Sequence, residues 1–230
     1  MRERPLLFSG EMVVEILEGR KTKTRRAIQP QPFIDERGNV ARGETYKGRA
    51  VMRHYGQHPD GSPQWENFAR MACPYGKPGD RLWVREAVRA EELPGGTNGV
   101  RYVADNAFRK IENTAEAADR WLALNHYGKR RSANVPAIHM PRWACRLVLE
   151  LTDVRVERLQ DISLQDVRAE GVEVREFALF GANAEERQKI AAGHFAMLWT
   201  RINGAESWAA NPYVWALSFR RLYPSQGDLT

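Results

Sequence analysis

Cysteine is scarce in this chain, which has two among its 230 residues, Cys73 and Cys145. Neither belongs to a CxxC pair, so the sequence argues against a disulfide framework and predicts a reducing compartment. No stretch approaches the ~18 consecutive apolar residues of a membrane-spanning helix. The N-terminal residues show only a brief apolar run, unlike a signal peptide. We therefore expect a cytoplasmic protein with no membrane partner.

Histidine is also rare, with five residues in the chain. His54, His58 and Cys73 are the candidates for zinc ligands, but Gly56 and Pro59 break any helical spacing between them. A fourth ligand at a spacing typical of zinc sites is not evident. The sequence therefore predicts no metal site and no cofactor.

The composition is that of a folded protein with a basic surface. Hydrophobic residues make up 43% of the chain and charged residues 28%, with a formal net charge of +6 and a pI near 9.5. Such a charge favours a phosphate-bearing or polyanionic partner such as RNA, although a merely soluble basic surface gives the same balance. The oligomeric state is not encoded in any of these patterns.

The positive charge is densest in the stretch Gly-Arg-Lys-Thr-Lys-Thr-Arg-Arg, residues 19–26, which holds five cations in eight residues. It follows a helix that we expect to begin after Ser9, a good N-cap, and to end at Gly19. We interpret the stretch as a turn, too dense in charge to lie in the core. Its threonine hydroxyls, lysines and guanidinium groups suit either nucleophilic catalysis or phosphate binding.

Short strands interrupted by a few helices, without regular βαβ alternation, predict an α+β fold whose strands close into a small β-barrel. No clean linker divides the chain, so we expect one domain over residues 1–223, with insertions at about 29–70 and 87–137 and a tail at 224–230. The first insertion has an irregular pattern and is interpreted as a lid. Strands are expected at residues 6–8, 81–86, 100–104, 143–150, 154–159 and 214–222.

Helices are expected at about 115–124 and 184–202, and Ser163 followed by Asp166 is typical of a capping box before a short helix that Gly171 ends. In the longer helix, Ile190, His194, Met197 and Leu198 lie on one side, which we interpret as the buried side.

Three segments of the chain together resemble an ASCH domain of the PUA-like superfamily. They are the basic stretch, the turn Lys77-Pro78-Gly79-Asp80, and the segment from Leu159 to Gly171. The spacing Gly-x-Lys-x-x-Thr-x-Arg is especially similar to that of the bacterial N4-acetylcytidine amidohydrolases, which are very small ASCH proteins. The segments 73–76, 138–143 and 211–215 resemble the longer ASCH proteins carried by bacteriophages and prophages.

The resemblance implies a barrel with flanking helices, and a cleft that accepts a nucleoside or a nucleic acid. It also implies a catalytic set of Thr24, Lys21 and Glu170. In that reading Thr24 attacks the acyl carbon of an N4-acylated cytidine, and a neutral Lys21 takes its proton. Glu170 assists, by binding the cytosine amino group or by helping to protonate the leaving nitrogen. The substrate would be an acylated nucleoside.

The same stretch has a second interpretation. Lys21, Arg25 and Arg26 could hold an RNA backbone while Thr24 donates one hydrogen bond. The protein would then be a noncatalytic RNA-binding or nucleotide-binding module, and a ribonuclease is the third hypothesis. Glu170 favours the hydrolase, because a phosphate-binding surface has no use for a carboxylate.

Residues outside this stretch are candidates for substrate binding. Trp83 and Tyr75 can stack a nucleobase, although alternation along the strands places some aromatic residues in the core instead. Arg85 and Glu86 follow Trp83 and can read a base edge or pair with each other. His139, at a strand entry, is expected near the cleft. Together with Arg25 and Arg26, these residues complete the predicted substrate site.

Overall fold

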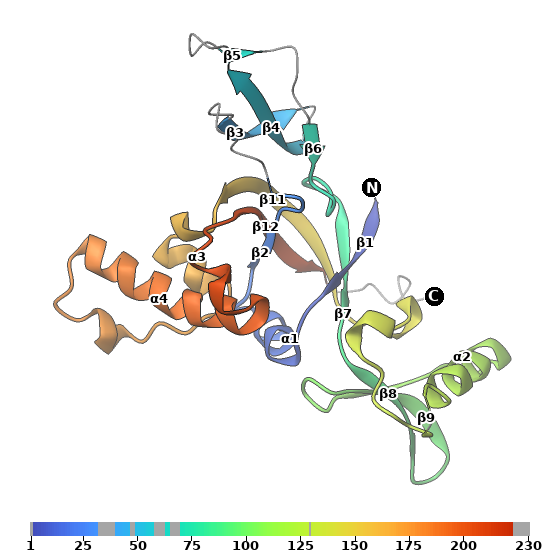
Figure 1. Cartoon of the computed structure of the whole chain (residues 1–230). Coiled ribbons are helices and arrows are strands. Elements are labelled where there is room, and N and C mark those ends of the chain that lie inside the picture. Colours follow the sequence, from blue (N-terminus) through green and yellow to red (C-terminus); the bar gives the residue numbers. More distant parts are fainter. Residues whose placement is uncertain are drawn as a thin grey trace. The chain divides into compact units, whose positions relative to one another are not determined.

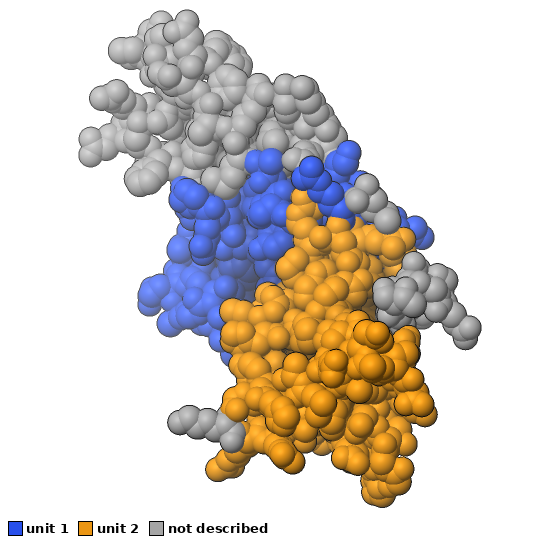
Figure 2. All heavy atoms as spheres, turned by 90° about the vertical axis from the view of Figure 1, so that its right-hand side faces the viewer, with its two compact units in different colours: residues 1–2, 20–80, 150–220 blue, residues 3–19, 81–149, 221–230 orange. Residues whose placement is uncertain are grey.

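The computed structural model describes residues 2–31, 40–46, 49–57, 63–64, 70–128 and 130–222, with side chains left out between 32 and 71. The described chain divides into two compact units, coloured separately in Figure 2. The first unit comprises residues 1–2, 20–80 and 150–220, and the second comprises residues 3–19, 81–149 and 221–230. The single domain over residues 1–223 stays a prediction.

Helices and strands are mixed along the chain, which confirms the α+β class (Figure 1). The helices are α1 (Gly10–Leu17), α2 (Ala115–Asn125), α3 (Leu164–Ala169) and α4 (Ala184–Asn203). The strands are β1 (Glu3–Leu7), β2 (Lys23–Ala27), β3 (Val40–Tyr46), β4 (Arg49–Gln57), β5 (Pro63–Gln64), β6 (Arg70–Ala72), β7 (Arg81–Arg85), β8 (Val88–Leu93), β9 (Thr97–Tyr102), β10 (Phe108–Lys110), β11 (Val148–Arg158) and β12 (Tyr213–Leu222).

The first unit is built on the strand order β11-β12-β2, with helices α3 and α4 packed together. Strand β2 pairs antiparallel with β12, so that Thr24 lies opposite Leu217. In Figure 1, α3 lies between β2 and the long helix α4. The apolar core of this unit is formed by buried residues of α3, α4 and the segments beside them. They are Leu159, Ile162, Val167, Val174, Leu179, Ala191, Phe195, Trp199 and Val214.

The second unit contains the parallel pair β1 and β7 and an antiparallel sheet of order β10-β9-β8, on which α2 packs. Strand β7 alternates buried and half-buried residues, as its sequence predicts. Gly95 and Gly96, both at positive φ, turn the chain between β8 and β9. The core residues of this sheet and helix are Val88, Ala90, Val100, Tyr102, Trp121, Leu124, Val135, Met140, Ala144 and Cys145.

The local signals for helix ends are confirmed. The side chain of Ser9 caps α1, and Gly19 follows that helix at φ 75°. Ser163 caps α3, and Asn183 forms a full capping box with Glu186 at the start of α4. These signals depend on a few neighbouring residues, which is why sequence alone places them well.

Several predictions about longer stretches are wrong. The basic stretch is a turn only at its start, because from Lys23 onward it forms β2. The strands predicted at 143–150 and 154–159 are replaced by the single strand β11, which begins at Val148 and continues through Thr152. Among the described strands no sheet closes into a barrel. The first insertion is not irregular, because β3 and β4 pair along seven residues within it.

The buried side of α4 also differs from the prediction. Ala191, Phe195 and Trp199 are its buried residues, at a spacing of four, whereas Met197 is 66% exposed. His194 is half-buried, and its Nδ1 lies 2.9 Å from the carbonyl oxygen of Ile190. The aromatic rings of Phe195 and Trp199 bury more apolar surface than the predicted side offers, and they determine which way the helix faces.

Candidate active site

The site begins where the chain enters β2. Lys21 precedes this strand and forms an isolated antiparallel bridge with Glu170, the residue at the end of α3. Beside it, the backbone amide of Thr22 donates to the carbonyl oxygen of Ala169 at 2.8 Å. Gly171 follows at φ 79°, a conformation that glycine adopts without strain and that ends the helix here. These contacts fix two backbone segments side by side although 149 residues separate Lys21 from Glu170.

Lys21 and Glu170 also join through their side chains. Nζ of Lys21 donates to Oε2 of Glu170 at 2.6 Å and to the backbone carbonyl oxygen of the same residue at 2.8 Å. Both residues are 3% exposed, so the pair is held out of water. Burial lowers the pKa of the Lys21 amine, the Glu170 carboxylate opposes this, and Arg26 and Arg25 add to the lowering. Burial thus favours the neutral form of this amine more than exposure to water would.

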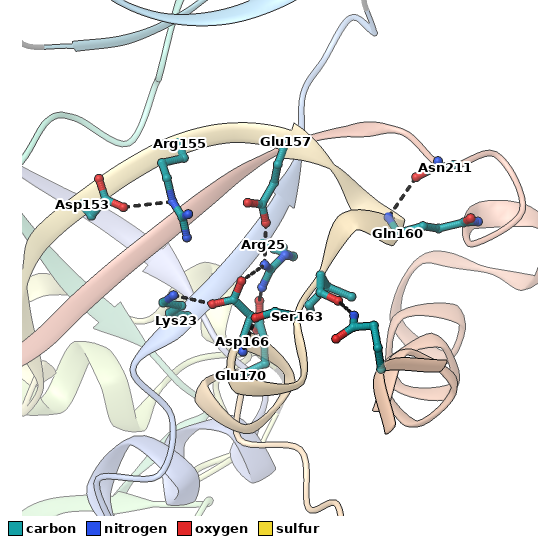
Figure 3. Close-up of polar contacts among 12 residues, drawn as sticks. Lys23, Arg25, Asp153, Arg155, Glu157, Gln160, Ser163, Asp166, Glu170 and Asn211 are labelled. Carbon is teal, nitrogen blue, oxygen red and sulfur yellow. Dashed lines mark hydrogen bonds and ion pairs between the residues drawn. The ribbon is translucent and has the colours of Figure 1, made fainter. Parts of the chain in front are cut away.

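Arg25 extends the pair into a network of alternating charge, drawn in Figure 3. Its Nη2 lies 2.5 Å from Oε1 of Glu157 and donates to Oδ2 of Asp166 at 2.9 Å. Its Nη1 donates to Oε1 of Glu170 at 3.2 Å. Lys23, on the same face of β2, donates to the other oxygen of Asp166. Three of the five cations of the basic stretch are therefore paired with carboxylates of their own unit.

The network corrects the expectation that this stretch is too charged for the core. Lys21, Thr24 and Arg25 are all buried, at 3 to 4% exposure. Charged groups can be buried when they are paired and hydrogen-bonded, and the three carboxylates supply those partners. Partial burial alone would raise the pKa of Asp166, yet Lys23 and Arg25 together hold it below its ordinary value.

Sequence reasoning missed Glu157 and Asp166 as members of this site. Asp166 was interpreted only as half of a capping box, and its backbone amide does donate to Ser163 Oγ at 3.1 Å. Its carboxylate, however, binds Lys23 and Arg25. The available signal was the spacing of these two cations, which places both on one face of a strand.

Thr24 lies within β2, is 4% exposed and faces the side of the strand opposite to Lys23 and Arg25. The alternation of side chains along a strand places Arg26 on the same side of β2 as Thr24. Arg26 is one of the groups that lower the Lys21 pKa. Among the described residues, no hydrogen bond joins the Thr24 hydroxyl to Lys21 or to Glu170. The structure thus brings Lys21 and Glu170 into contact and places Thr24 three residues after Lys21, in β2.

Arg26 and Tyr75, both predicted to bind substrate, belong to the first unit and are electrostatically coupled to each other. Burial lowers the pKa of Arg26, against the opposing effects of Tyr75 and Glu170. Burial likewise raises the pKa of the Tyr75 hydroxyl, which Arg26 opposes. Tyr75 is half-buried and so keeps part of its ring at the surface.

The other predicted binding residues belong to the second unit. Trp83 is half-buried, with the guanidinium carbons of Arg85 and Arg142 at 5.3 and 5.7 Å from its ring centre. The Arg85 guanidinium donates to the backbone carbonyl of Ile138. In this unit the Trp83 ring is thus a packing surface for two arginines.

Glu86 does not pair with Arg85, as one interpretation of the sequence had it. It is 1% exposed and accepts two hydrogen bonds from Arg146, each of 2.8 Å. Burial raises the pKa of Glu86, and Arg146 opposes the change. His139 packs its ring against Tyr127, with ring centres 5.6 Å apart. Glu86 and His139 thus each make contacts within the second unit.

Two further observations concern metal ligands and membrane-spanning helices. Within the described residues, no group of three or more His, Cys, Asp or Glu side chains could hold a metal ion. The zinc candidate His58 and the side chain of His54 lie outside the described part of the chain. No helix in the described part combines the length and the hydropathy that crossing a bilayer requires.

Comparison of the chain with models of protein families, with curated proteins and with solved structures found no match in any of the three.

Proposed function

We propose that this protein is an ASCH-type amidohydrolase of the PUA-like superfamily that cleaves the exocyclic amide of an N4-acylated cytidine or a related acylated nucleoside. The observation that carries the proposal is the buried contact between Lys21 and Glu170, with Nζ and Oε2 2.6 Å apart. A lysine whose pKa is lowered by burial is suited to the role of general base.

In the proposed reaction, the Thr24 hydroxyl attacks the acyl carbon while the Lys21 amine takes its proton. The carbon–nitrogen bond then breaks, and Lys21 returns that proton to the leaving exocyclic nitrogen, releasing cytidine. Water next attacks the acyl-threonine ester and gives a proton to Lys21. The bond between the acyl carbon and the Thr24 oxygen then breaks, Lys21 returns the proton to that oxygen, and the carboxylic acid leaves. Glu170 holds the amine in place throughout, as the third member of a triad does.

The same geometry counts against the phosphate clamp. A clamp needs cations that are available to a phosphate, yet Lys21 and Arg25 are buried and engaged by carboxylates. To bind an RNA backbone, both would have to break ion pairs that are already shielded from water, which is costly. Buried carboxylates beside the site would also repel a phosphate. We therefore rank the RNA-binding module below the hydrolase.

The proposal is tested by incubating the full chain with N4-acetylcytidine and measuring cytidine and acetate by chromatography. Lys21→Met and Thr24→Val keep the volume of each side chain but remove the base and the nucleophile. Each should lower kcat by at least about 100-fold, the usual contribution of a positioned base or nucleophile. Glu170→Gln should lower kcat less, because it keeps the shape of the side chain and a hydrogen-bond acceptor.

Lys189→Met is the matched control, because Lys189 is an exposed lysine of α4 that pairs with Glu185. It removes the same chemical group without touching the site, and it should leave kcat unchanged. The absence of hydrolysis by the parent protein across a panel of N4-acylcytidines would sink the proposal. Release of RNA fragments by the parent, abolished in Lys21→Met, would instead favour the ribonuclease.

A further inference from the structure

A second set of cations surrounds a cavity in the second unit, at β10 and the first half of α2. The cavity has a volume of about 170 Å³ and is lined by Arg109, Lys110 and Arg120, together with Glu112, Ala117 and Trp143. Pockets for drug-sized ligands measure roughly 300 Å³ or more. This cavity is therefore suited to a small group, such as a phosphate or a single aromatic ring, with the rest of a ligand outside it.

Arg109 is fixed at this cavity by neutral partners. Its Nη1 donates to the carbonyl oxygen of Cys145 at 2.9 Å and its Nη2 to that of Trp143 at 2.6 Å. Backbone carbonyls orient a guanidinium without cancelling its charge, and a guanidinium has five donors, so others remain for a ligand. The fold thus holds a positive charge in place beside an open volume.

Lys110 and Arg120 add charge from the surface. Both side chains belong to exposed residues, and Arg120 makes one hydrogen bond, to the carbonyl of Glu116 at 3.2 Å. Within the part of the chain that the structure describes, neither these two cations nor Arg109 forms an ion pair with a carboxylate. Glu112 is the one acidic residue in the described lining of the cavity. Positive charge therefore predominates there, which favours an anionic ligand.

Trp143 gives the cavity an aromatic wall. It is half-buried and packs partly against the core of the unit. Aromatic rings bind nucleobases by stacking, a contact worth about 1 to 3 kcal/mol for each base and available to any base. Cations beside an aromatic wall match the two halves of a nucleotide, a charged phosphate and a flat base.

We propose that this cavity binds the phosphate of a nucleoside monophosphate, with the attached base against Trp143. The inference does not depend on the hydrolase, since it concerns another unit and other residues. The same chemistry is presented by a free mononucleotide and by the 5′-terminal nucleotide of an RNA. The experiment distinguishes these two sources.

Isothermal titration of the full chain with adenosine monophosphate, adenosine and inorganic phosphate tests the proposal. An adenine ligand is used because the proposed substrate of the first unit is a cytidine. Adenosine monophosphate should bind at least 10-fold more tightly than either of the other two. The double variant Lys110→Gln, Arg120→Gln should weaken its binding by at least 10-fold, and because both residues are exposed, the fold should be unaffected.

The matched control is the double variant Arg175→Gln, Lys189→Gln. It removes the same charge from exposed residues of the first unit, each of which pairs with a glutamate. It should leave the affinity within 2-fold. Trp143→Leu should weaken binding of adenosine monophosphate but not of inorganic phosphate, because the backbone carbonyl that holds Arg109 is retained. Two results would overturn the proposal. One is that the Lys110→Gln, Arg120→Gln variant binds adenosine monophosphate as tightly as the parent, and the other is that adenosine binds as tightly as its monophosphate.

A hexamer of adenylate with and without a 5′-phosphate identifies the source of the ligand. If the phosphorylated hexamer binds at least as tightly as the mononucleotide and the unphosphorylated one does not, the cavity receives an RNA end. If only the mononucleotide binds, the cavity receives a free nucleotide. Lys21→Met should bind all of these probes as the parent does, which keeps this test separate from that of the hydrolase.

Discussion

Two groups of cations, one in each unit, are held in opposite ways. In the first, Lys21, Lys23 and Arg25 are engaged by carboxylates of the same unit. In the second, Arg109 and Arg120 donate to backbone carbonyls at the rim of a cavity. Three crowded cations of the basic stretch are thus paired with carboxylates, while cations spread over β10 and α2 are held by neutral groups beside a cavity. The local density of cations along a chain says little about where an anion binds.

If this contrast is correct, removing a buried, paired cation of the basic stretch should lower the free energy of unfolding far more than removing a cation of the cavity. Arg25→Met leaves Glu157, Asp166 and Glu170 without their shared partner. Breaking a buried ion pair from one side costs about 3 to 5 kcal/mol of the free energy of unfolding. Urea denaturation measures this loss. The exposed pair of Arg155 and Asp153 provides the control, since Arg155→Met should cost less than about 1 kcal/mol.

A second test concerns the direction in which pH changes stability. Because folding lowers the Lys21 pKa, the folded protein holds fewer protons than the unfolded chain between that lowered value and 10.5. The free energy of unfolding therefore rises with pH across this window. Below the window Lys21 is protonated in both states, and the whole destabilisation caused by burying its charge is present. Lys21→Met removes this dependence, so the stability of the parent relative to the variant should rise toward pH 10.5, by about 1.4 kcal/mol for each unit of pKa lowering.

Urea denaturation from pH 7 to pH 10 follows this difference. Lys189→Met is again the control. The difference in free energy of unfolding between this variant and the parent should not change with pH, because that lysine is exposed. A parent that loses stability relative to Lys21→Met as the pH rises would show that the pKa is raised, and it would remove the base from the proposed reaction.

The smallest effect is expected at Glu91, a paired carboxylate of the second unit. Hydrogen bonds from Arg101, with a smaller contribution from Arg89, lower its pKa to about 2. Its contribution to stability is complete above pH 4.5 and is lost as the pH falls toward 2. Glu91→Gln should therefore flatten the acid side of the stability profile, by less than about 1 kcal/mol because the pair is partly solvated. Thermal denaturation between pH 2 and 6 measures this, and an unchanged profile would contradict it.

The features that sequence predicts well depend on near neighbours. Ser9 and Ser163 each cap a helix through the backbone amide three residues later. Such contacts form within one turn of helix and need no knowledge of the rest of the chain. The α+β class follows from the same local patterns.

The features that sequence misses depend on distant partners. Arg25 looks like a surface residue until Glu157 and Asp166 are known to face it, and no local rule pairs residues so far apart. The continuity of β11 through Asp153 is of the same kind, since aspartate is depleted in strands. For the proposed catalytic set, the resemblance indicates Thr24, Lys21 and Glu170. Of these, the structure places Lys21 and Glu170 in contact, and the charge network around them is visible only in the fold.

The long separation between Lys21 and Glu170 also has a consequence during synthesis. Ribosomes add about 5 to 20 residues per second, so the 149 residues from Thr22 to Glu170 take roughly 7 to 30 s to make. The basic stretch is thus made well before the carboxylates that later pair with it. A growing chain thus carries solvent-exposed lysines where the finished one carries a buried ion pair, and the two states should differ most in how they interact with the negatively charged ribosomal RNA beside them.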